Sequence, residues 1–160
     1  MNRRTFVTRS AAAATLVAAH PFHILKAKSP NERINLAFIG AGGKGAHAIR
    51  MLKNNEMMNF VAFADVDEVK PAESFKNHPT VPRFKDFRKM LDRHDKDIDA
   101  VVISTPDHMH HYPAKWCMKM GKPIYLEKPL AHSIEQCREL AALEKKPGSH
   151  AKWEIKAIRV

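Results

Sequence analysis

The sequence predicts an α/β fold, in which a doubly wound parallel sheet carries helices on both faces. Strand-like and helix-like patterns alternate from residue 34 to residue 144, which is the order that parallel strands with crossover helices require. Residues 100–104 form a continuous apolar run, as expected of a strand buried on both faces. A chain of 160 residues is long enough for one good core. We therefore expect one domain over residues 32–144, with strands in the spatial order 3-2-1-4-5.

Each strand is predicted from a short apolar run that ends in polar or turn residues. In chain order, the expected strands are residues 34–39, 60–64, 83–84, 100–104 and 124–126.

The helices are predicted from apolar residues at helical spacing and from capping residues. The first helix carries Gly45, Ala48, Ile49 and Leu52 on one face, and a short second helix covers residues 67–75. The third helix is capped by Asp86 and turns Phe87, Met90 and Leu91 inward. The fourth helix ends over residues 116–120 before Gly121, and the capping box of residues 133–136 starts the last helix.

A glycine-rich segment, residues 40–45, follows the first strand and opens the first helix. Its G-x-G-x-x-G spacing predicts a tight turn at Gly40, a close approach of backbone to a pyrophosphate at Gly42, and close helix–strand packing at Gly45. Asp65 ends the second strand twenty residues after Gly45, where a carboxylate would accept hydrogen bonds from the ribose hydroxyls of adenosine. A bland glycine turn with a surface aspartate is the alternative. The strand and helix context favours a dinucleotide site in a Rossmann-type fold, which would also include the intervening residues Ala41, Gly43 and Lys44.

A second polar cluster follows the fourth strand and is rich in histidine. Asp107, His108, His110 and His111 could in principle hold a metal ion. However, ligands at successive positions of one turn converge poorly on one ion, and the sequence has no evident remote ligand set. We therefore predict no metal, with Asp107 capping a helix and one histidine reaching a cofactor.

A third polar cluster, Glu127-Lys128-Pro129, follows the fifth strand. Adjacent charges are often a solvated ion pair. Lys128, however, ends a buried strand and is fixed by Pro129, so we expect its ammonium at the mouth of the cleft. Desolvation there would lower its pKa and fit it for proton transfer.

Together, the three clusters resemble the glycine-rich, Thr-Pro-Asp-His-x-His and Glu-Lys-Pro signatures of the Gfo/Idh/MocA oxidoreductases, over residues 32 to about 144. The resemblance implies hydride transfer between NAD(P) and a hydroxyl-bearing carbon of a sugar or cyclitol. It assigns Lys128 to catalysis and, with Glu127, to the nicotinamide ribose and substrate. Further cofactor contacts are expected from Ser104, Thr105, Pro106, His108 and His110.

Acidic residues around Asp65 indicate which dinucleotide is preferred. Asp67 and Glu68 lie close by, and no arginine follows. These charges would repel a 2′-phosphate, so we expect NAD rather than NADP.

The formal net charge of +10 belongs mainly to the two ends of the chain. Residues 1–19 contribute +3 and residues 145–160 contribute +4, which leaves +3 for everything between. No basic stripe interleaved with aromatic residues appears there, so nucleic-acid binding is not expected. Cys117 and Cys137 both lie in apolar helical patterns and are read as buried, unpaired thiols rather than a disulfide.

Residues 1–31 have the pattern of an export signal and linker. Arg3 and Arg4 precede the uncharged stretch 10–19, which is too short and too alanine-rich to span a membrane. The paired arginines resemble the twin-arginine type, although Asn2 stands where Ser or Thr is usual. An amphipathic first helix of the domain is the alternative. We expect a protein exported by the twin-arginine machinery.

Residues 145–160 depart from the resemblance. Residues 152–158 alternate polar and apolar and could form an edge strand. Codons for residues 152–159, read two bases in, can also encode Met-Gly-Asn-Gln-Gly-His-Ser, close to a segment of the family's secreted branch. We therefore expect an aberrant tail produced by a frameshift near residues 144–150, which the nucleotide sequence of the gene would test.

Members of the resembled family continue into a second, sheet-rich α+β domain, which we expect this chain to lack. That domain usually supplies the substrate pocket and the contacts between subunits, so homo-oligomers are expected only where it is present. Three functional classes remain open: the nucleotide half of an NAD-dependent oxidoreductase, an NAD-binding module without catalysis, and a truncated product without function.

Overall fold

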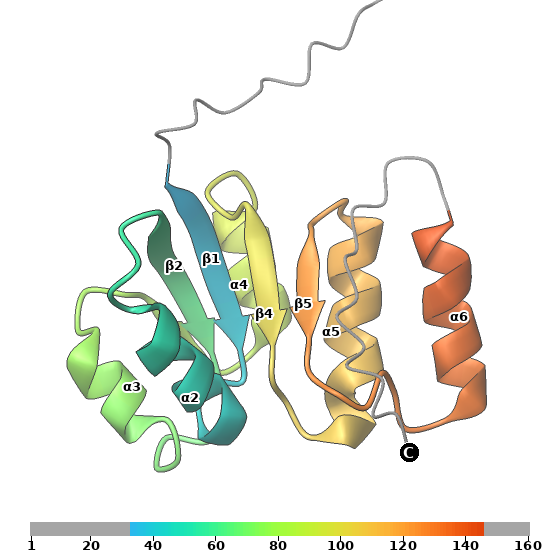
Figure 1. Ribbon diagram of the computed structural model, residues 1–160, viewed down its shortest axis with the longest axis horizontal. Coiled ribbons are helices and arrows are strands. Elements are labelled where there is room, and N and C mark those ends of the chain that lie inside the picture. Colours follow the sequence, from blue (N-terminus) through green and yellow to red (C-terminus); the bar gives the residue numbers. More distant parts are fainter. Residues whose placement is uncertain (1–32, 146–160) are drawn as a thin grey trace, which may run out of the picture. The chain divides into compact units, whose positions relative to one another are not determined.

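The computed structural model describes residues 33–145, which form a five-stranded parallel sheet with helices on both faces (Figure 1). The spatial order is β3-β2-β1-β4-β5, which confirms the predicted doubly wound topology. The strands are β1 (Ile34–Ile39), β2 (Met58–Ala64), β3 (Arg83–Phe84), β4 (Ala100–Ile103) and β5 (Ile124–Leu126).

Within residues 33–145, five helices connect and follow the strands. The helices are α2 (Gly43–Leu52), α3 (Ala72–Asn77), α4 (Phe87–His94), α5 (Asp107–Lys119) and α6 (Ile134–Glu144).

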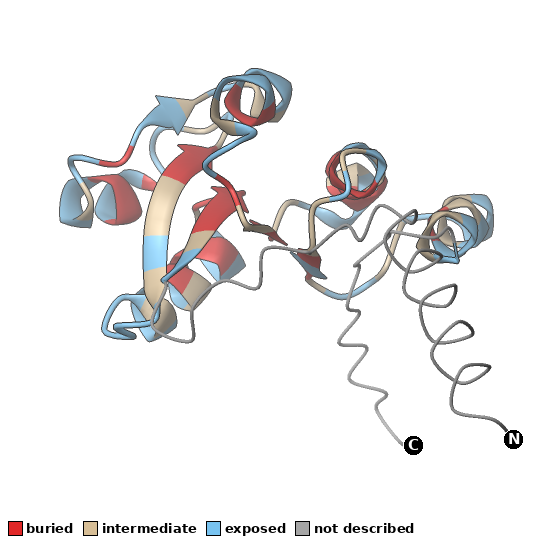
Figure 2. Ribbon diagram, turned by 90° about the horizontal axis from the view of Figure 1, so that it is seen from above, coloured by how far each residue is buried: buried red, intermediate tan, exposed pale blue. Residues whose placement is uncertain are grey.

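The two faces of the sheet bury separate apolar clusters. On one face, Ile49 of α2 and Phe75 of α3 pack with Phe38 and Phe63 of the central strands. The other face is covered by α4, α5 and α6, with Met90, Leu91, Cys117 and Leu140 among its buried residues. Figure 2 shows buried residues in the strands and on the inward sides of the helices, with exposed residues outside. This is the two-sided burial that makes the strands of a parallel sheet apolar throughout.

All strand pairs are parallel, so the carboxyl ends of the strands share one edge of the sheet. Figure 1 shows these ends at the lower edge of the domain, where each strand turns into a loop and the next helix. Residues 40–42, 65–71 and 104–106 are three of these loops. In open α/β sheets, ligands bind at this edge.

Three predicted elements have other bounds in the structure. The fourth strand ends at Ile103 rather than at residue 104. The second strand starts at Met58 rather than residue 60, because Met58 pairs with Ile34 before the register shifts after Leu36. The helix expected over 67–75 covers only Ala72–Asn77.

A side chain accounts for the shortened helix. Asp67 Oδ1 accepts hydrogen bonds from the N–H groups of Val69 and Lys70, at 2.8 and 3.3 Å. These bonds hold a turn, and Pro71 then precedes the first helical residue.

The caps predicted for α4 and α6 are present, with one difference. Asp86 accepts from the N–H of Arg88 at the start of α4, and Ser133 accepts from the N–H of Gln136 at the start of α6. The Gln136 side chain, however, accepts from His132 rather than from Ser133 itself.

Both cysteines are unpaired, as predicted. Cys117 is fully buried and Cys137 is half-buried. Burial raises the pKa of the Cys117 thiol to about 12.

Within residues 33–145, no helix is long and apolar enough to cross a membrane. The predicted export signal and linker at residues 1–31 lie outside the described residues, as do the edge strand and frameshifted tail over 146–160.

Candidate functional site

The glycine turn after β1 leaves no room for side chains at two positions. Gly40 has a φ of +87°, and a Cβ there would lie 2.6 Å from the carbonyl oxygen of Ser104 in the β4 loop. A Cβ on Gly45, in the first turn of α2, would lie 1.8 Å from the carbonyl oxygen of Gly40. The turn, the helix and the β4 loop can therefore approach one another only because both residues are glycine. This is the close helix–strand packing predicted for Gly45.

The N-terminus of α2 is open. Gly42 is its N-cap and makes no side-chain cap, and the first turn holds no acidic residue. Gly43 has a φ of +51° and a Cβ there would meet nothing within 4 Å. The first N–H groups of a helix have no partner within it and attract anions. An open helix N-terminus of this kind is a favourable position for a phosphate group.

Asp65 braces the glycine turn directly. Its Oδ2 accepts hydrogen bonds from the N–H groups of Ala41 and Gly42, at 2.8 and 3.1 Å, and its Oδ1 accepts from Asp67 at 3.0 Å. A carboxylate has about four lone-pair sites, so Asp65 retains capacity for a ribose hydroxyl. Sequence reasoning gave Asp65 only the ribose contact, because the fold of the turn around the carboxylate is a tertiary feature.

Charged groups surround Asp65 on its outer side. Glu68 pairs with Lys85 at 2.8 Å, and the ammonium of Lys85 lowers the pKa of the Glu68 carboxyl. The N–H groups of Val69 and Lys70 lower the pKa of Asp67. Sequence reasoning missed Lys85, which comes from the β3–α4 loop and is brought here by the pairing of β3 with β2.

Two hydroxyl groups in the β4 loop are buried without a partner. Ser104 Oγ and Thr105 Oγ1 have no hydrogen bond within the described part of the chain. A buried, unsatisfied hydroxyl is costly and calls for an explanation. Both residues line the cleft described below, so a polar ligand such as a dinucleotide would supply the missing partners.

The three histidines near the start of α5 have different environments. His108 is exposed, and the N–H of this residue donates to Asp107 at 2.7 Å. His111 is buried, and its Nε2 lies 2.7 Å from Glu139 of α6. His110 is 1% exposed, and both of its ring nitrogens face backbone carbonyl oxygens.

Two predictions bear on this histidine cluster. Within the described residues, no group of three potential ligands is arranged to hold a metal ion. Asp107 is the first residue of α5 rather than its N-cap, which is Pro106. A carboxylate in the first turn still complements the helix dipole, and the N–H of His108 lowers the pKa of Asp107.

Glu127 and Lys128 follow β5 at the same edge. The N–H of Glu127 donates to the carbonyl oxygen of Ile103 at 3.0 Å, which fixes the loop start against β4. Lys128 is exposed, so residues 33–145 do not supply the burial that the sequence analysis expected of it.

These segments line one cleft of about 480 Å³ at the carboxyl edge of the sheet. Twelve of the fourteen predicted site residues line it; the other two, Ala41 and Gly45, are buried in the turn beneath. The cleft thus joins the glycine turn, Asp65, the β4 loop and Lys128. Lining residues that sequence reasoning missed include Val66, Lys70, Lys85, Phe87 and Met109.

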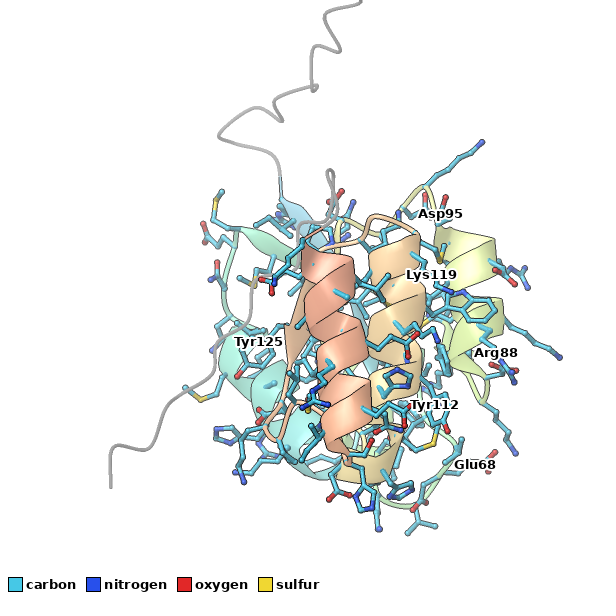
Figure 3. All side chains as sticks on the ribbon, turned by 90° about the vertical axis from the view of Figure 1, so that its right-hand side faces the viewer. Glu68, Arg88, Asp95, Tyr112, Lys119 and Tyr125 are labelled. Carbon is cyan, nitrogen blue, oxygen red and sulfur yellow. The ribbon has the colours of Figure 1, made fainter. Side chains whose placement is uncertain are left out.

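A larger groove of about 910 Å³ lies between α4 and α5. Figure 3 shows Arg88 of α4 and Tyr112 and Lys119 of α5 on this side of the molecule. Its lining is aromatic and basic, with Phe87 and Trp116 in ring contact. Size alone does not identify a site. The smaller cleft has the helix N-terminus, the carboxylate and the unpartnered hydroxyls, so we assign the functional site there.

Residues 34–152 match the sequence model of an oxidoreductase family with an NAD-binding Rossmann fold, GFO_IDH_MocA. Among curated relatives, a glycosyl hydrolase family 109 protein of Phocaeicola vulgatus is 33% identical over 80% of this chain and 25% of its own length. Inositol 2-dehydrogenase 2 of Saccharopolyspora erythraea is 32% identical over 72% of this chain and 34% of its own length.

Solved structures share the fold. Myo-inositol dehydrogenase from Lactobacillus casei, in complex with NAD(H) and myo-inositol, matches with a TM-score of 0.67 and 24% identity, over 76% of this chain and 36% of that one. The chain thus spans about a quarter to a third of the length of the curated relatives it matches.

Proposed function

Because this chain belongs to the Gfo/Idh/MocA oxidoreductase family, we propose that its cleft binds NAD and that the chain is the nucleotide half of an NAD-dependent oxidoreductase. The observation that carries the proposal is the cleft itself, which brings the glycine turn, Asp65 and Lys128 to one edge of the sheet. A turn without these side chains around it would not distinguish a dinucleotide from any other anion.

The residues of the cleft suit successive parts of a dinucleotide. The open N-terminus of α2 would hold the pyrophosphate, and Asp65 would bond the adenosine ribose. Ser104 and Thr105 would satisfy their buried hydroxyls on the ligand. Glu127 and Lys128 would reach the nicotinamide ribose and the substrate, as in the family pattern.

The preference for NAD over NADP is part of the proposal. Asp65 and Asp67 line the cleft and Glu68 belongs to the same loop, so this loop carries three carboxylates where the adenosine ribose would bind. Two lysines lie beside these carboxylates along the cleft, Lys70 and Lys85, and Lys85 of the β3–α4 loop is already paired with Glu68. A 2′-phosphate would meet more negative than positive charge there.

The nicotinamide cofactor would supply hydride chemistry when bound, as acceptor in its oxidised form and as donor in its reduced form. Lys128 would hold or release the proton of the reacting hydroxyl. We propose a hydroxyl-bearing carbon of a sugar or cyclitol as the reacting group. The support is the 32% identical relative named inositol 2-dehydrogenase 2. The whole enzyme's activity is a proposal, since the chain spans only about a third of that relative.

A second activity is favoured by one observation, the 33% identity to a glycosyl hydrolase family 109 protein. The two activities differ in product: a dehydrogenase yields an oxidised sugar and reduced nicotinamide, whereas a glycosidase yields a free sugar. An NAD-binding module without catalysis would yield neither.

Calorimetric titration of the purified chain with NAD and, separately, with NADP tests the binding proposal. We expect saturable binding of NAD and at least tenfold weaker binding of NADP. Absence of NAD binding by a chain shown to be folded by circular dichroism would disprove the proposal. Tighter binding of NADP would overturn the assigned preference.

We also propose export through the twin-arginine machinery, from Arg3 and Arg4 and the uncharged stretch 10–19. A reporter protein that folds in the cytoplasm should be exported when residues 1–31 are fused to its N-terminus. Replacing both arginines with lysine should stop export; unchanged export would refute a twin-arginine signal.

A further inference from the structure

His110 lies between the two loops that carry the reacting end of the cleft. Its Nε2 is 2.7 Å from the carbonyl oxygen of Thr105, and its Nδ1 is 2.6 Å from the carbonyl oxygen of Pro129. The side chain belongs to the first turn of α5, and the residue is 1% exposed. One buried ring thus touches the loop after β4 and the loop after β5.

The chemistry of these contacts restricts what the ring can do. A backbone carbonyl oxygen can only accept a hydrogen bond, so each ring nitrogen has to donate for both contacts to be bonds. A ring that donates through both nitrogens satisfies Thr105 and Pro129 together. It then has no lone pair or free N–H left for a ligand.

The contact with Pro129 is important because little else holds that loop. Within residues 33–145, no other hydrogen bond joins residues 128–131 to the rest of the domain. Leu130 and Ala131 pack against the apolar core, but apolar packing is not directional. The preceding residue is Lys128, which lines the cleft.

We propose that His110 is a positioning residue that donates from both ring nitrogens and so fixes the Lys128 loop against the β4 loop. This role would replace the sequence-based expectation that His110 contacts the cofactor, and it leaves the expectation for His108 unchanged. The consequence for NAD affinity rests on the proposed function, whereas the double donation and the loop order do not.

A matched pair of variants tests the proposal in the full chain. His110→Phe keeps a buried ring without donors, and His111→Phe does the same at the next position of α5, where the partner is Glu139 instead of a loop. Both changes should lower the melting temperature. Only His110→Phe should weaken NAD binding in calorimetry, by tenfold or more, because only it releases the two loops.

Nuclear magnetic resonance supplies a readout that a merely structural role would not change. In the chain labelled with ¹⁵N-histidine, the His110 ring should show a bound proton on both nitrogens. Amide exchange at Leu130 and Ala131 should accelerate in His110→Phe and stay unchanged in His111→Phe.

The outcomes separate this proposal from the proposed function. If the unaltered chain does not bind NAD, the ring protons and the amide exchange still decide the role of His110. A single ring proton on His110 would overturn the double donation, and this measurement does not require that His110→Phe folds. Equal NAD affinities and equal amide exchange in the two variants would overturn the positioning role.

Discussion

The two halves of the cleft are held in place by different means. In the half formed by β1 and β2, backbone packs on backbone at Gly40 and Gly45, and Asp65 bonds the turn at two N–H groups. In the half formed by β4 and β5, one hydrogen bond within residues 33–145, to the buried ring of His110, joins the loop of residues 128–131 to the rest of the domain, and Leu130 and Ala131 add apolar packing. The β1–β2 half is therefore fixed mainly by close backbone packing, whereas the loop after Lys128 in the β4–β5 half has one directional contact, from the His110 ring.

Under the proposed function, this difference means that NAD binding and catalysis would have different structural requirements. The β1–β2 half, where the adenosine end of NAD would bind, needs only residues that the domain itself contains. Lys128 is exposed, so its use as a base requires burial that residues 33–145 do not provide. Perturbing each half should give effects of different kind and size.

The largest expected effect concerns catalysis. A chain of residues 1–160 should bind NAD yet show no turnover, since an open cleft does not align the substrate with the nicotinamide. Alignment contributes about 7–11 kcal/mol to well-oriented reactions. Nicotinamide absorbance, followed with a panel of sugars and cyclitols, should stay flat. Steady reduction of NAD that disappears in Lys128→Ala would contradict this prediction and show that residues 1–160 catalyse the reaction alone.

The next-largest effect is expected from a substitution that disturbs the close backbone packing of the β1–β2 half. Gly45→Ala places a Cβ 1.8 Å from the carbonyl oxygen of Gly40, so the turn has to move. We expect a loss of about 3 kcal/mol or more in the free energy of unfolding, measured with urea. The control, Gly43→Ala, meets nothing within 4 Å and is strained only by its φ of +51°. It should cost about 1–2 kcal/mol, and equal losses would show that close packing does not hold the turn.

A smaller effect is expected from the carboxylate that braces the turn. Asp65→Ala removes the predicted ribose acceptor and the acceptor for the N–H groups of Ala41 and Gly42. NAD binding should weaken by about 1–3 kcal/mol in calorimetry. Asp92→Ala, on the exposed side of α4, is the matched control and should bind as the unaltered chain does. If both variants keep full affinity, Asp65 is not the ribose ligand.

The smallest effect concerns the contact between helices α5 and α6. Lys115 and His111 of α5 both contact Glu139 of α6 and hold its pKa below the ordinary value of 4.5. A lowered pKa in the folded state stabilises the fold above pH 4.5, and this stabilisation is lost as the pH falls through the lowered value. Glu139→Gln should therefore be less stable than the unaltered chain at neutral pH, and the difference should shrink in acid. Urea unfolding at about pH 7 and about pH 3.5 measures both; a difference that grows in acid would refute the assignment.

Much of the fold could be read from the sequence because it depends on local patterns. The apolar run 100–104 and the alternation of elements gave the strand order, and Asp86 was recognised as a cap from its position before an apolar stripe. The turn at 67–71 was missed, because Asp67 competes for the backbone N–H groups that a helix would use. Such competition is visible only once the side chain is placed.

The candidate site divides in the same way. Spacing was enough to bring Gly40, Asp65 and Lys128 to one edge, since parallel strands place their carboxyl ends together. Spacing could not reveal which way His110 faces, because its carbonyl partners lie 5 and 19 residues away along the chain. Nor could it reveal Lys85, which reaches the cleft from the loop that follows the two-residue strand β3.

The buried thiol of Cys117 is a chemical probe of how often the core of this domain opens. Only a thiolate reacts quickly with alkylating reagents, and a fully buried thiol with a pKa raised to about 12 is almost wholly protonated at neutral pH. Cys117 should therefore be alkylated only in molecules that have opened, whereas the half-buried Cys137 should react sooner. Mass spectrometry of the two cysteines over time would measure how often the core opens. Bound nucleotide should lower the alkylation rate of Cys117, and a nucleotide that binds more tightly should lower it further.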